Sequence, residues 1–433
     1  MMQRRVVITG LGVLAPNGTG KENFWSACLT GLSGIRRITR FDASNLPTQI
    51  AGEVQDFDPH ALGLSAEESA NLDRATQFAL AAANLALEDG GIGGIDRLSS
   101  ELHESEREAT GVCIGTAMAS VDEGERVWKK LTLNGKQALT DMPGAINTAM
   151  IVMAYVPSAA IAAHHQLYGP CSTISTGCSA GADAIGQAFW TIQEGRADRM
   201  LAGGTDSSIN YSGINVFSVM KALSTRNDEP ERASRPYDNA RDGFVMAEGA
   251  GVLLLEEREV AIARGAHIYA EIITFASNCN AYHMTALPDD GMPLQQLLRQ
   301  ALEETGIAGE QVGYINAHGS STLPNEVAET AAYKAVFGAH AYHIPISATK
   351  SMIGHSQGAA SAIETIVTAL ALEQQVLPPT INQEYADPRC DLDYVPNVPR
   401  NTTFDIALTH SSGFGGVNSV LVLAHPAWFD RQL

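Results

Sequence analysis

One cysteine and two histidines of this 433-residue chain stand in small-residue, glycine-containing turns that follow apolar stretches. The three turns read Thr173-Ile174-Ser175-Thr176-Gly177-Cys178-Ser179-Ala180-Gly181, Asn316-Ala317-His318-Gly319-Ser320-Ser321-Thr322 and Lys350-Ser351-Met352-Ile353-Gly354-His355. A thiolate is a strong nucleophile, and imidazole gains and loses a proton near neutral pH. These residue types together indicate acyl transfer through a cysteine, assisted by imidazoles.

The residues around Cys178 predict a strand, a sharp turn and a helix. Small and β-branched residues precede the cysteine, and the Ala-rich segment 182–192 follows it. A thiol at a helix N-terminus lies at the positive end of the backbone dipole, which predicts a lowered pKa. Gly177, Ser179 and Gly181 are expected to let a substrate carbonyl approach the backbone. The alternative is a buried structural cysteine, which is the commoner role of a single cysteine.

Each histidine turn follows a predicted strand, and so does a further turn, Gly413-Phe414-Gly415-Gly416. In α/β sheets, ligands bind at the carboxyl ends of the strands. Cys178, His318 and His355 can therefore meet in space, although 140 and 37 residues separate them along the chain. A metal site is a weaker hypothesis, because neither histidine has a nearby partner at ligand spacing and Cys178 has no second thiol.

Composition and charge exclude several classes of protein. The chain is 45% hydrophobic and 18% charged, and its formal net charge of −20 argues against nucleic acid or an anionic membrane as partner. It has no run of about 18 apolar residues, so no membrane span is expected. Gly10, Gly12 and Pro16 interrupt the basic and apolar start, which predicts a first strand rather than a signal peptide. Gly10-Leu11-Gly12 also lacks the third glycine of a phosphate loop.

The six cysteines are scattered without C-x-x-C spacing. They indicate neither a zinc site nor a disulfide framework, and they favour a reducing, cytoplasmic location. Apolar strands alternate with helical segments along the chain, which predicts an α/β fold with mostly parallel pairing. Strands near residues 6–8 and 270–274 open similar series, a weak sign of internal duplication.

The turns resemble those of the β-ketoacyl-acyl-carrier-protein synthase family, and the similarity runs from Val7-Ile8-Thr9-Gly10-Leu11-Gly12 to Gly416. Further matching stretches are Ser234-Arg235-Pro236-Tyr237-Asp238, Arg241-Asp242-Gly243-Phe244-Val245 and Ala281-Tyr282-His283-Met284-Thr285. The resemblance implies a thiolase fold, in which duplicated βα halves form a layered αβαβα arrangement. It implies an N-terminal half, 1–258, carrying the nucleophilic cysteine, and a C-terminal half, 259–433, carrying two catalytic histidines.

Several stretches look more like the ketosynthase α subunit of bacterial type II polyketide synthases than like the fatty-acid elongating enzyme. They are Arg226-Asn227-Asp228-Glu229-Pro230-Glu231, Ala247-Glu248-Gly249, Asn278-Cys279-Asn280, Asn316-Ala317-His318-Gly319-Ser320 and Glu329-Thr330-Ala331-Ala332-Tyr333-Lys334. The implied reaction is a decarboxylative Claisen condensation that extends a polyketide chain by two carbons. The alternative is a homodimeric fatty-acid elongating synthase II.

Two other hypotheses are weaker. A non-catalytic subunit resembling a chain-length factor would lack the thiol of Cys178. A degradative thiolase would need a second cysteine near the C-terminal glycine turn, and the last cysteine, Cys390, lies well before it.

The resemblance implies a role for each side chain of the site. Cys178 would accept an acyl chain from a carrier-protein thioester, and the N–H groups of Cys178 and Phe414 would form the oxyanion hole. Phe414 would also act as a gate, or else be a packed phenylalanine. His318 and His355 would promote decarboxylation of malonyl-carrier protein and stabilise the enolate. No metal or redox cofactor is implied, because the thiol, the imidazoles and the substrate supply the chemistry. The substrates would be carried on the phosphopantetheine arm of the carrier protein.

Supporting residues follow from the same resemblance. Lys350 would orient the histidines and Glu329 electrostatically, Glu326 occupies a commonly acidic position, and Ser320 and Thr322 supply hydroxyls beside the first histidine. The stretch Thr409-His410-Ser411-Ser412 departs from the Asn and Phe of the elongating enzymes, and His410 is interpreted as a packed side chain rather than a third histidine of the site.

The implied partners are an acyl-carrier protein and a second subunit. The second subunit is a homologous chain-length factor in a heterodimer, or a second copy in a homodimer. Because the carrier protein is acidic, Lys221 and Arg226 are candidate contacts, followed by Arg36, Arg37 and Arg40, although each could be an ordinary solvated charge. The stretch 118–163 matches the family least well, and in the family this region contributes to the dimer interface and the chain-binding pocket.

Overall fold

Five strands of the first half of the chain lie side by side with five strands of the second half. The structure is a computed structural model that describes residues 4–93, 102–118, 121–138 and 153–431. The first-half strands are β1 (Val6–Ala15), β5 (Thr110–Gly115), β6 (Cys171–Ile174), β7 (Arg199–Asp206) and β8 (Gly249–Glu257). The second-half strands are β9 (Ala270–Cys279), β10 (Val312–Asn316), β11 (Ile346–Ser347), β14 (Ile406–Ser412) and β15 (Val417–Ala424). The short strands are β2 (Gly18–Thr19), β3 (Arg36–Arg37), β4 (Ile50–Ala51), β12 (Val376–Leu377) and β13 (Arg400–Asn401).

The two halves repeat one strand topology. The order across the sheet is β6-β5-β7-β8-β1 in the first half and β11-β10-β14-β15-β9 in the second, and a short antiparallel contact between β1 and β9 joins them. Strands that correspond in chain order occupy corresponding places and pair in the same directions. This repetition supports the weak sign of duplication read from the sequence, whereas the boundary at 258/259 stays a prediction.

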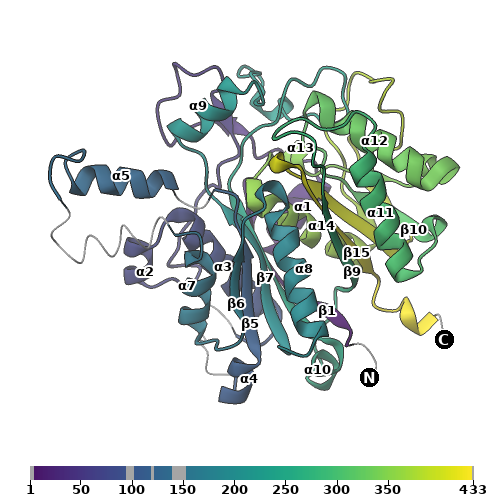
Figure 1. Cartoon of the computed structure of the whole chain (residues 1–433), viewed down its shortest axis with the longest axis horizontal. Coiled ribbons are helices and arrows are strands. Elements are labelled where there is room, and N and C mark those ends of the chain that lie inside the picture. The colour runs from purple at the N-terminus through teal and green to yellow at the C-terminus, as the bar shows by residue number, and fades with distance from the viewer. Residues whose placement is uncertain (1–3, 94–101, 119–120, 139–152, 432–433) are drawn as a thin grey trace.

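The described residues form thirteen α-helices, some of which make three layers against the two sets of strands. They are α1 (Lys21–Leu29), α2 (Ala66–Asn71), α3 (Arg74–Asp89), α4 (Glu104–Glu108), α5 (Val121–Leu131), α7 (Val156–His165), α8 (Ala180–Gln193), α9 (Tyr211–Val219), α10 (Arg258–Ala263), α11 (Met292–Thr305), α12 (Leu323–Phe337), α13 (Lys350–Ile353) and α14 (Ala360–Gln374). In Figure 1, α3 and α7 cover one side, α11 and α12 cover the other, and α8 and α14 pack between the two sets of strands. The expected αβαβα layering is therefore confirmed.

The expectation of mostly parallel pairing is wrong. The pairs β5–β6, β5–β7, β10–β11 and β10–β14 are parallel, whereas β7–β8, β8–β1, β14–β15 and β15–β9 are antiparallel. A strand that is buried on both faces has the same apolar pattern in either direction, so the pattern did not reveal the direction.

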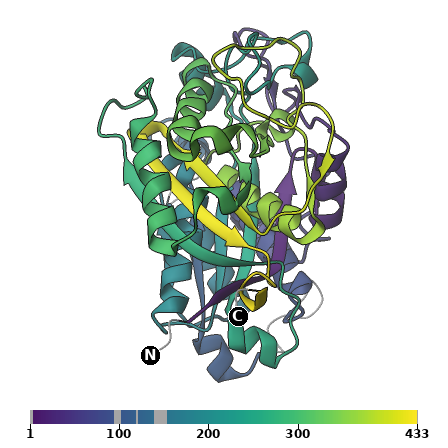
Figure 2. The ribbon, with the colours of Figure 1, turned by 90° about the vertical axis from the view of Figure 1, so that its right-hand side faces the viewer.

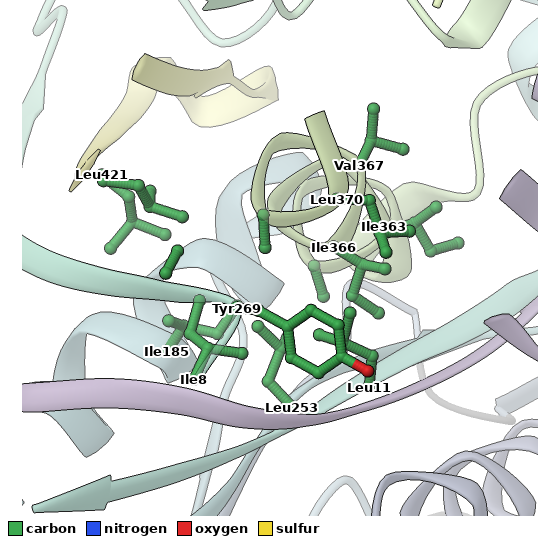
Figure 3. Packing of buried hydrophobic residues seen from close by; sticks show 14 of the residues in the cluster. Ile8, Leu11, Ile185, Leu253, Tyr269, Ile363, Ile366, Val367, Leu370 and Leu421 are labelled. Atoms are coloured by element: carbon green, nitrogen blue, oxygen red, sulfur yellow. The ribbon is translucent and has the colours of Figure 1, made fainter. Parts of the chain in front are cut away.

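The central layer forms the main hydrophobic core. Figure 3 shows Ile363, Ile366 and Leu370 of α14 packed toward Leu11 of β1 and Leu253 of β8. All thirteen residues Ala360–Leu372 of α14 are buried. Helix α14 is thus enclosed by packed side chains, which hold the turn that precedes it in place.

The two chain ends lie close together, and one helix projects from the rest of the molecule. Figures 1 and 2 place both ends of the described chain on the same side, where the guanidinium of Arg5 lies 4.1 Å from the ring centroid of Phe429. Helix α5 projects away from the layers in Figure 1. Residues 119–120 and 139–152 of the poorly matching stretch lie outside the described residues. No helix in the described part of the chain has the length and apolarity needed to cross a bilayer.

Candidate active site

The turn that carries Cys178 has the predicted strand-turn-helix form. Strand β6 ends at Ile174, a 3₁₀ turn covers Gly177–Ser179, and α8 begins at Ala180. Gly177 has φ +65°, a left-handed conformation that other residues rarely adopt. Gly181 was expected to let a substrate approach, but it instead allows close packing of the chain. A Cβ there would lie 2.8 Å from the backbone of Gly358 and of α14.

The thiol of Cys178 is more strongly buried than its sequence context indicated. Cys178 is only 9% exposed, and this burial raises the pKa of its thiol to about 11. The charge of Lys350 and a backbone hydrogen bond from Phe414 oppose the rise without cancelling it. The expected lowering of the thiol pKa is therefore wrong, since desolvation of the buried thiol outweighs the favourable charges.

This burial predicts how Cys178 reacts with a small alkylating reagent. We expect its alkylation by iodoacetamide to accelerate about tenfold per pH unit, with no plateau below about pH 9.5, because only the thiolate reacts. Peptide mass spectrometry of each cysteine across this range measures the rate, with the exposed Cys171 as an internal reference. A plateau between pH 6 and 8 for Cys178 would contradict the raised pKa.

The two histidines converge on Cys178. The sulfur of Cys178 and one nitrogen of each imidazole all lie within 4.8 Å of one another, and the two ring centroids are 5.2 Å apart. His318 and His355 are each 3% exposed. These side chains line one cavity of about 420 Å³. Of the residues predicted for the site, the cavity wall includes Cys178, Lys221, His318, Ser320, Thr322, His355 and Phe414.

Hydrogen bonds at Nδ1 determine which imidazole nitrogen carries the proton. The N–H of Gln357 donates to Nδ1 of His355 over 3.1 Å. The pKa of both histidines lies well below its usual value, because the rings are buried and Lys350 is nearby. A neutral ring whose Nδ1 accepts must carry its proton on Nε2. His355 is thus a hydrogen-bond donor through Nε2.

Lys350 gives His318 the same tautomer. Its ammonium donates to the carbonyl of His318 over 2.7 Å, lies 3.4 Å from Nδ1 of His318, and pairs with Glu364. Because an ammonium only donates, Nδ1 of His318 is the acceptor. The hydroxyl of Ser411 lies 3.2 Å from this Nδ1 and 3.1 Å from the carbonyl oxygen of Cys178, so either atom can accept its hydrogen.

The ion-pair partner of Lys350 is a residue that the sequence analysis did not identify. The buried carboxylate bound to Lys350 belongs to Glu364 on α14, not to Glu329. Glu364 was missed because it lies inside an apolar helix, without a motif around it. The one available signal was a charged residue on a helix that is otherwise apolar on all sides.

Phe414 lies beside the thiol. Its ring is 39% exposed and stacks on Phe217 of α9, with the centroids 6.3 Å apart. Its backbone N–H lowers the pKa of the Cys178 thiol, so this donor lies near the atom that would attack an acyl carbonyl. Phe217 and Phe244 also line the cavity, and neither was identified from the sequence.

Glu329 belongs to a buried polar network behind the cavity. Its carboxyl group accepts from the hydroxyl of Tyr237 at 2.7 Å and from the N–H of Gly319 at 3.1 Å. Burial, reinforced by the nearby Glu326, raises its pKa to about 8. The hydrogen bond from the N–H of Gly319 therefore links Glu329 to the residue that follows His318.

The raised pKa of Glu329 predicts a pH-dependent stability. The folded state keeps this proton up to about pH 8, while the unfolded chain loses it near 4.5, so rising pH favours unfolding between these values. Glu329→Gln cannot ionise, and its melting temperature should fall less than that of the wild type between about pH 6 and pH 9. Parallel melting curves at matched salt measure this difference, and identical pH slopes would contradict the assignment.

Glu326 has a different environment. It forms an ion pair with the buried Arg241 at 3.0 Å and accepts from the N–H of Ser321 at 2.8 Å. The hydroxyls of Ser320 and Thr322 lie 2.9 Å apart at the cavity wall. Glu326 thus shapes the segment that follows His318 without lining the cavity.

His410 is packed, as interpreted. It bonds the hydroxyl of Tyr333 and lies 3.6 Å from Glu329, and it is not part of the cavity wall. Burial lowers its pKa to about 3, so it is a neutral ring.

The candidate carrier-protein contacts are dispersed. Lys221 lies exposed at the cavity wall, whereas Arg226 bonds Glu229 and the carbonyl of Ala240. Arg40 is paired with the buried Glu248. Lys221 is therefore the candidate with the most direct access to the site.

The same thiol and imidazoles could form a three-ligand metal site. The absence of a metal therefore stays a prediction. Metal analysis of the purified protein tests it.

The fold and the site define a class of thiol acyltransferases, and the comparisons identify the family. The chain matches the beta-ketoacyl synthase N-terminal domain over residues 3–261 and the C-terminal domain over residues 269–384. It belongs to the beta-ketoacyl synthase family.

Similar proteins come from two branches of this family. The chain is 45% identical to 3-oxoacyl-[acyl-carrier-protein] synthase 2 of Coxiella burnetii, over 98% of this chain and 99% of that one. It is 43% identical to the tetracenomycin polyketide synthase ketoacyl synthase alpha subunit of Streptomyces glaucescens, over 98% of each. A solved type II polyketide synthase acyl-carrier protein in complex with its ketosynthase matches with a TM-score of 0.86 and 38% identity, covering 98% and 99% of the two chains.

Proposed function

We propose that this chain catalyses decarboxylative condensation as the ketosynthase α subunit of a type II polyketide synthase. The observation that carries the proposal is the meeting of the Cys178 sulfur with two neutral imidazoles within 4.8 Å in one cavity. The stretches Arg226-Asn227-Asp228-Glu229-Pro230-Glu231 and Glu329-Thr330-Ala331-Ala332-Tyr333-Lys334, which look more like those of the ketosynthase α subunit, favour the polyketide branch. A fatty-acid elongating homodimer is the alternative, supported by the 45% identity to a synthase 2.

In the first half-reaction, the sulfur of Cys178 attacks the thioester of an acyl-carrier protein. The C–S bond to phosphopantetheine breaks, and the thiol proton of Cys178 ends on the departing sulfur. The charge of Lys350 and the N–H of Phe414 stabilise the developing thiolate. The N–H groups of Cys178 and Phe414 hold the oxyanion of the tetrahedral intermediate.

In the second half-reaction, malonyl-carrier protein enters the same cavity. The Nε2–H groups of His318 and His355 donate to the malonyl thioester carbonyl, so the negative charge left by departing CO₂ is stabilised as an enolate. The enolate carbon attacks the acyl carbonyl on Cys178, and collapse of the intermediate expels the Cys178 thiolate. The product is a β-ketoacyl chain two carbons longer.

Partner, location and cofactor follow from the same proposal. An acyl-carrier protein delivers both substrates on its phosphopantetheine arm, with Lys221 near the entrance. The second subunit is a chain-length factor, a proposal supported by the similarity (TM-score 0.86, 34% identity) to the solved ishigamide ketosynthase/chain length factor. The six free cysteines favour a reducing cytoplasm. No bound cofactor is needed.

Intact-mass analysis with acyl-carrier and malonyl-carrier proteins tests the function. We expect an acyl adduct on the chain and, after malonyl addition, a β-ketoacyl-carrier product. Measurements with the chain alone and with a co-expressed chain-length factor separate the branches. Product only with the factor supports the polyketide subunit, product without it supports the homodimeric synthase, and no adduct in either case contradicts both.

A further inference from the structure

A buried carboxylate that the mechanism does not use joins two turns at the edge of the site. Asp206, the last residue of β7, is fully buried. Its Oδ1 accepts from the hydroxyl of Thr116 at 2.9 Å and the N–H of Met118 at 3.1 Å. Its Oδ2 accepts from the N–H of Ala117 at 2.8 Å and the N–H of Gly358 at 2.6 Å. Each oxygen thus takes two donors.

These donors come from two separate parts of the chain. Residues 116–118 follow β5, the parallel neighbour of β7, whereas Gly358 lies in the 3₁₀ turn Gln357–Ala359 before α14. A Cβ on Gly358 would lie 2.6 Å from the nitrogen of Ala117 and 2.7 Å from Oδ2 of Asp206. Only glycine therefore lets this turn approach the carboxylate so closely.

The residue before Gly358 in the same turn bonds the imidazole of His355. The N–H of Gln357 donates to Nδ1 of His355, and the next N–H along, of Gly358, donates to Asp206. Gln357 has φ +53°, a left-handed conformation that is strained for a residue with a side chain and persists where its surroundings hold it. The bond from Gly358 to Asp206 anchors this turn.

The charge state of Asp206 suits this role. Burial raises its pKa to about 6, and the hydrogen bonds from Ala117, Gly358, Met118 and Thr116 oppose the rise. Near neutral pH the group is a carboxylate, which can accept all four hydrogen bonds.

We propose that Asp206 is a positioning residue for decarboxylation: it anchors the turn at Gln357 and Gly358, and so keeps the His355 ring oriented with Nε2–H toward the malonyl thioester. The inference rests on the proposed function. It assigns Asp206 no contact with substrate. Its loss should therefore slow the half-reaction that needs His355, whereas acyl transfer should not slow, because the charge of Asp206 only raises the pKa of the Cys178 thiol.

Asp206→Asn tests the proposal. In either orientation the new amide nitrogen faces at least one backbone N–H that it cannot accept, either that of Met118 or those of Ala117 and Gly358, so the carboxylate's grip on the two turns is disturbed. Two rates are measured in one sample: CO₂ release from malonyl-carrier protein and acyl transfer to Cys178. Their ratio does not depend on the fraction of folded protein. We expect the ratio to fall by about 10- to 100-fold, the size of effect expected for a displacement of about 1 Å.

Asp183→Asn is the matched control. Asp183 is another buried carboxylate, but its side chain bonds Thr176 and Ser419, on the nucleophile's side of the site. Its ratio should stay within about threefold of the wild type. Gly358→Ala places a Cβ against Oδ2 of Asp206 and so disturbs the same hydrogen bond from the side of the turn. It should lower the ratio as Asp206→Asn does.

The outcomes distinguish this inference from the proposed function on which it rests. An unchanged ratio in Asp206→Asn and Gly358→Ala overturns the positioning role, and so does an equal fall in Asp183→Asn. If the wild-type protein performs neither half-reaction, the proposed function fails, and the inference fails with it.

Discussion

Cys178→Ala is expected to carry no acyl group after incubation with an acyl-carrier protein, and to lose condensation by at least about a thousandfold. The sulfur of Cys178 is the only nucleophile assigned in the cavity wall, and removing a covalent nucleophile costs rates of this order. Intact mass measures the adduct, and product formation measures the condensation. Because the substitution removes a single sulfur atom from the cavity wall, the alanine variant should fold normally.

Cys171→Ala is the matched control for this experiment. Cys171 is an exposed cysteine of β6, seven residues before the nucleophile. Its variant should acquire the acyl group at the wild-type rate. Acylation that persists in Cys178→Ala would contradict the assigned nucleophile.

Lys350→Met is expected to destabilise the fold by about 3 kcal/mol at pH 8, because it leaves Glu364 buried without its ion-pair partner. Burial raises the pKa of Glu364 to about 7 even beside Lys350. Without the ammonium that pKa should rise further, so the variant must keep Glu364 protonated or bury an unpaired charge. The loss should therefore be smaller at pH 6 than at pH 8. Urea unfolding at both pH values measures it.

The double variant Lys350→Met with Glu364→Gln separates the ion pair from simple packing. Replacing both partners removes the unpaired charge, so more than half of the lost stability should return. Activity should not return, because Lys350 also holds Nδ1 of His318 and its charge favours the Cys178 thiolate. A double variant no more stable than Lys350→Met would contradict the charge-pair explanation.

The sequence alone predicted the side chains that the structure brings together in the cavity. Cys178, His318, His355 and Phe414 stand in small-residue turns after apolar strands, and such turns are local patterns of adjacent residues. The αβαβα layering followed from the resemblance that these turns carry.

The tertiary structure decided properties that depend on residues far apart in the chain. Asp206 and Glu364 acquire their partners only when β7 and α14 pack beside other elements, and no motif surrounds either residue. The direction of each strand likewise could not be predicted, because a fully buried strand has the same apolar pattern whether its pairing is parallel or antiparallel. The pKa of Cys178 is the clearest case: its local turn favours the thiolate, yet burial by distant segments raises that pKa to about 11. Desolvation is a sum over all surrounding atoms, so it is determined only when the whole chain has folded.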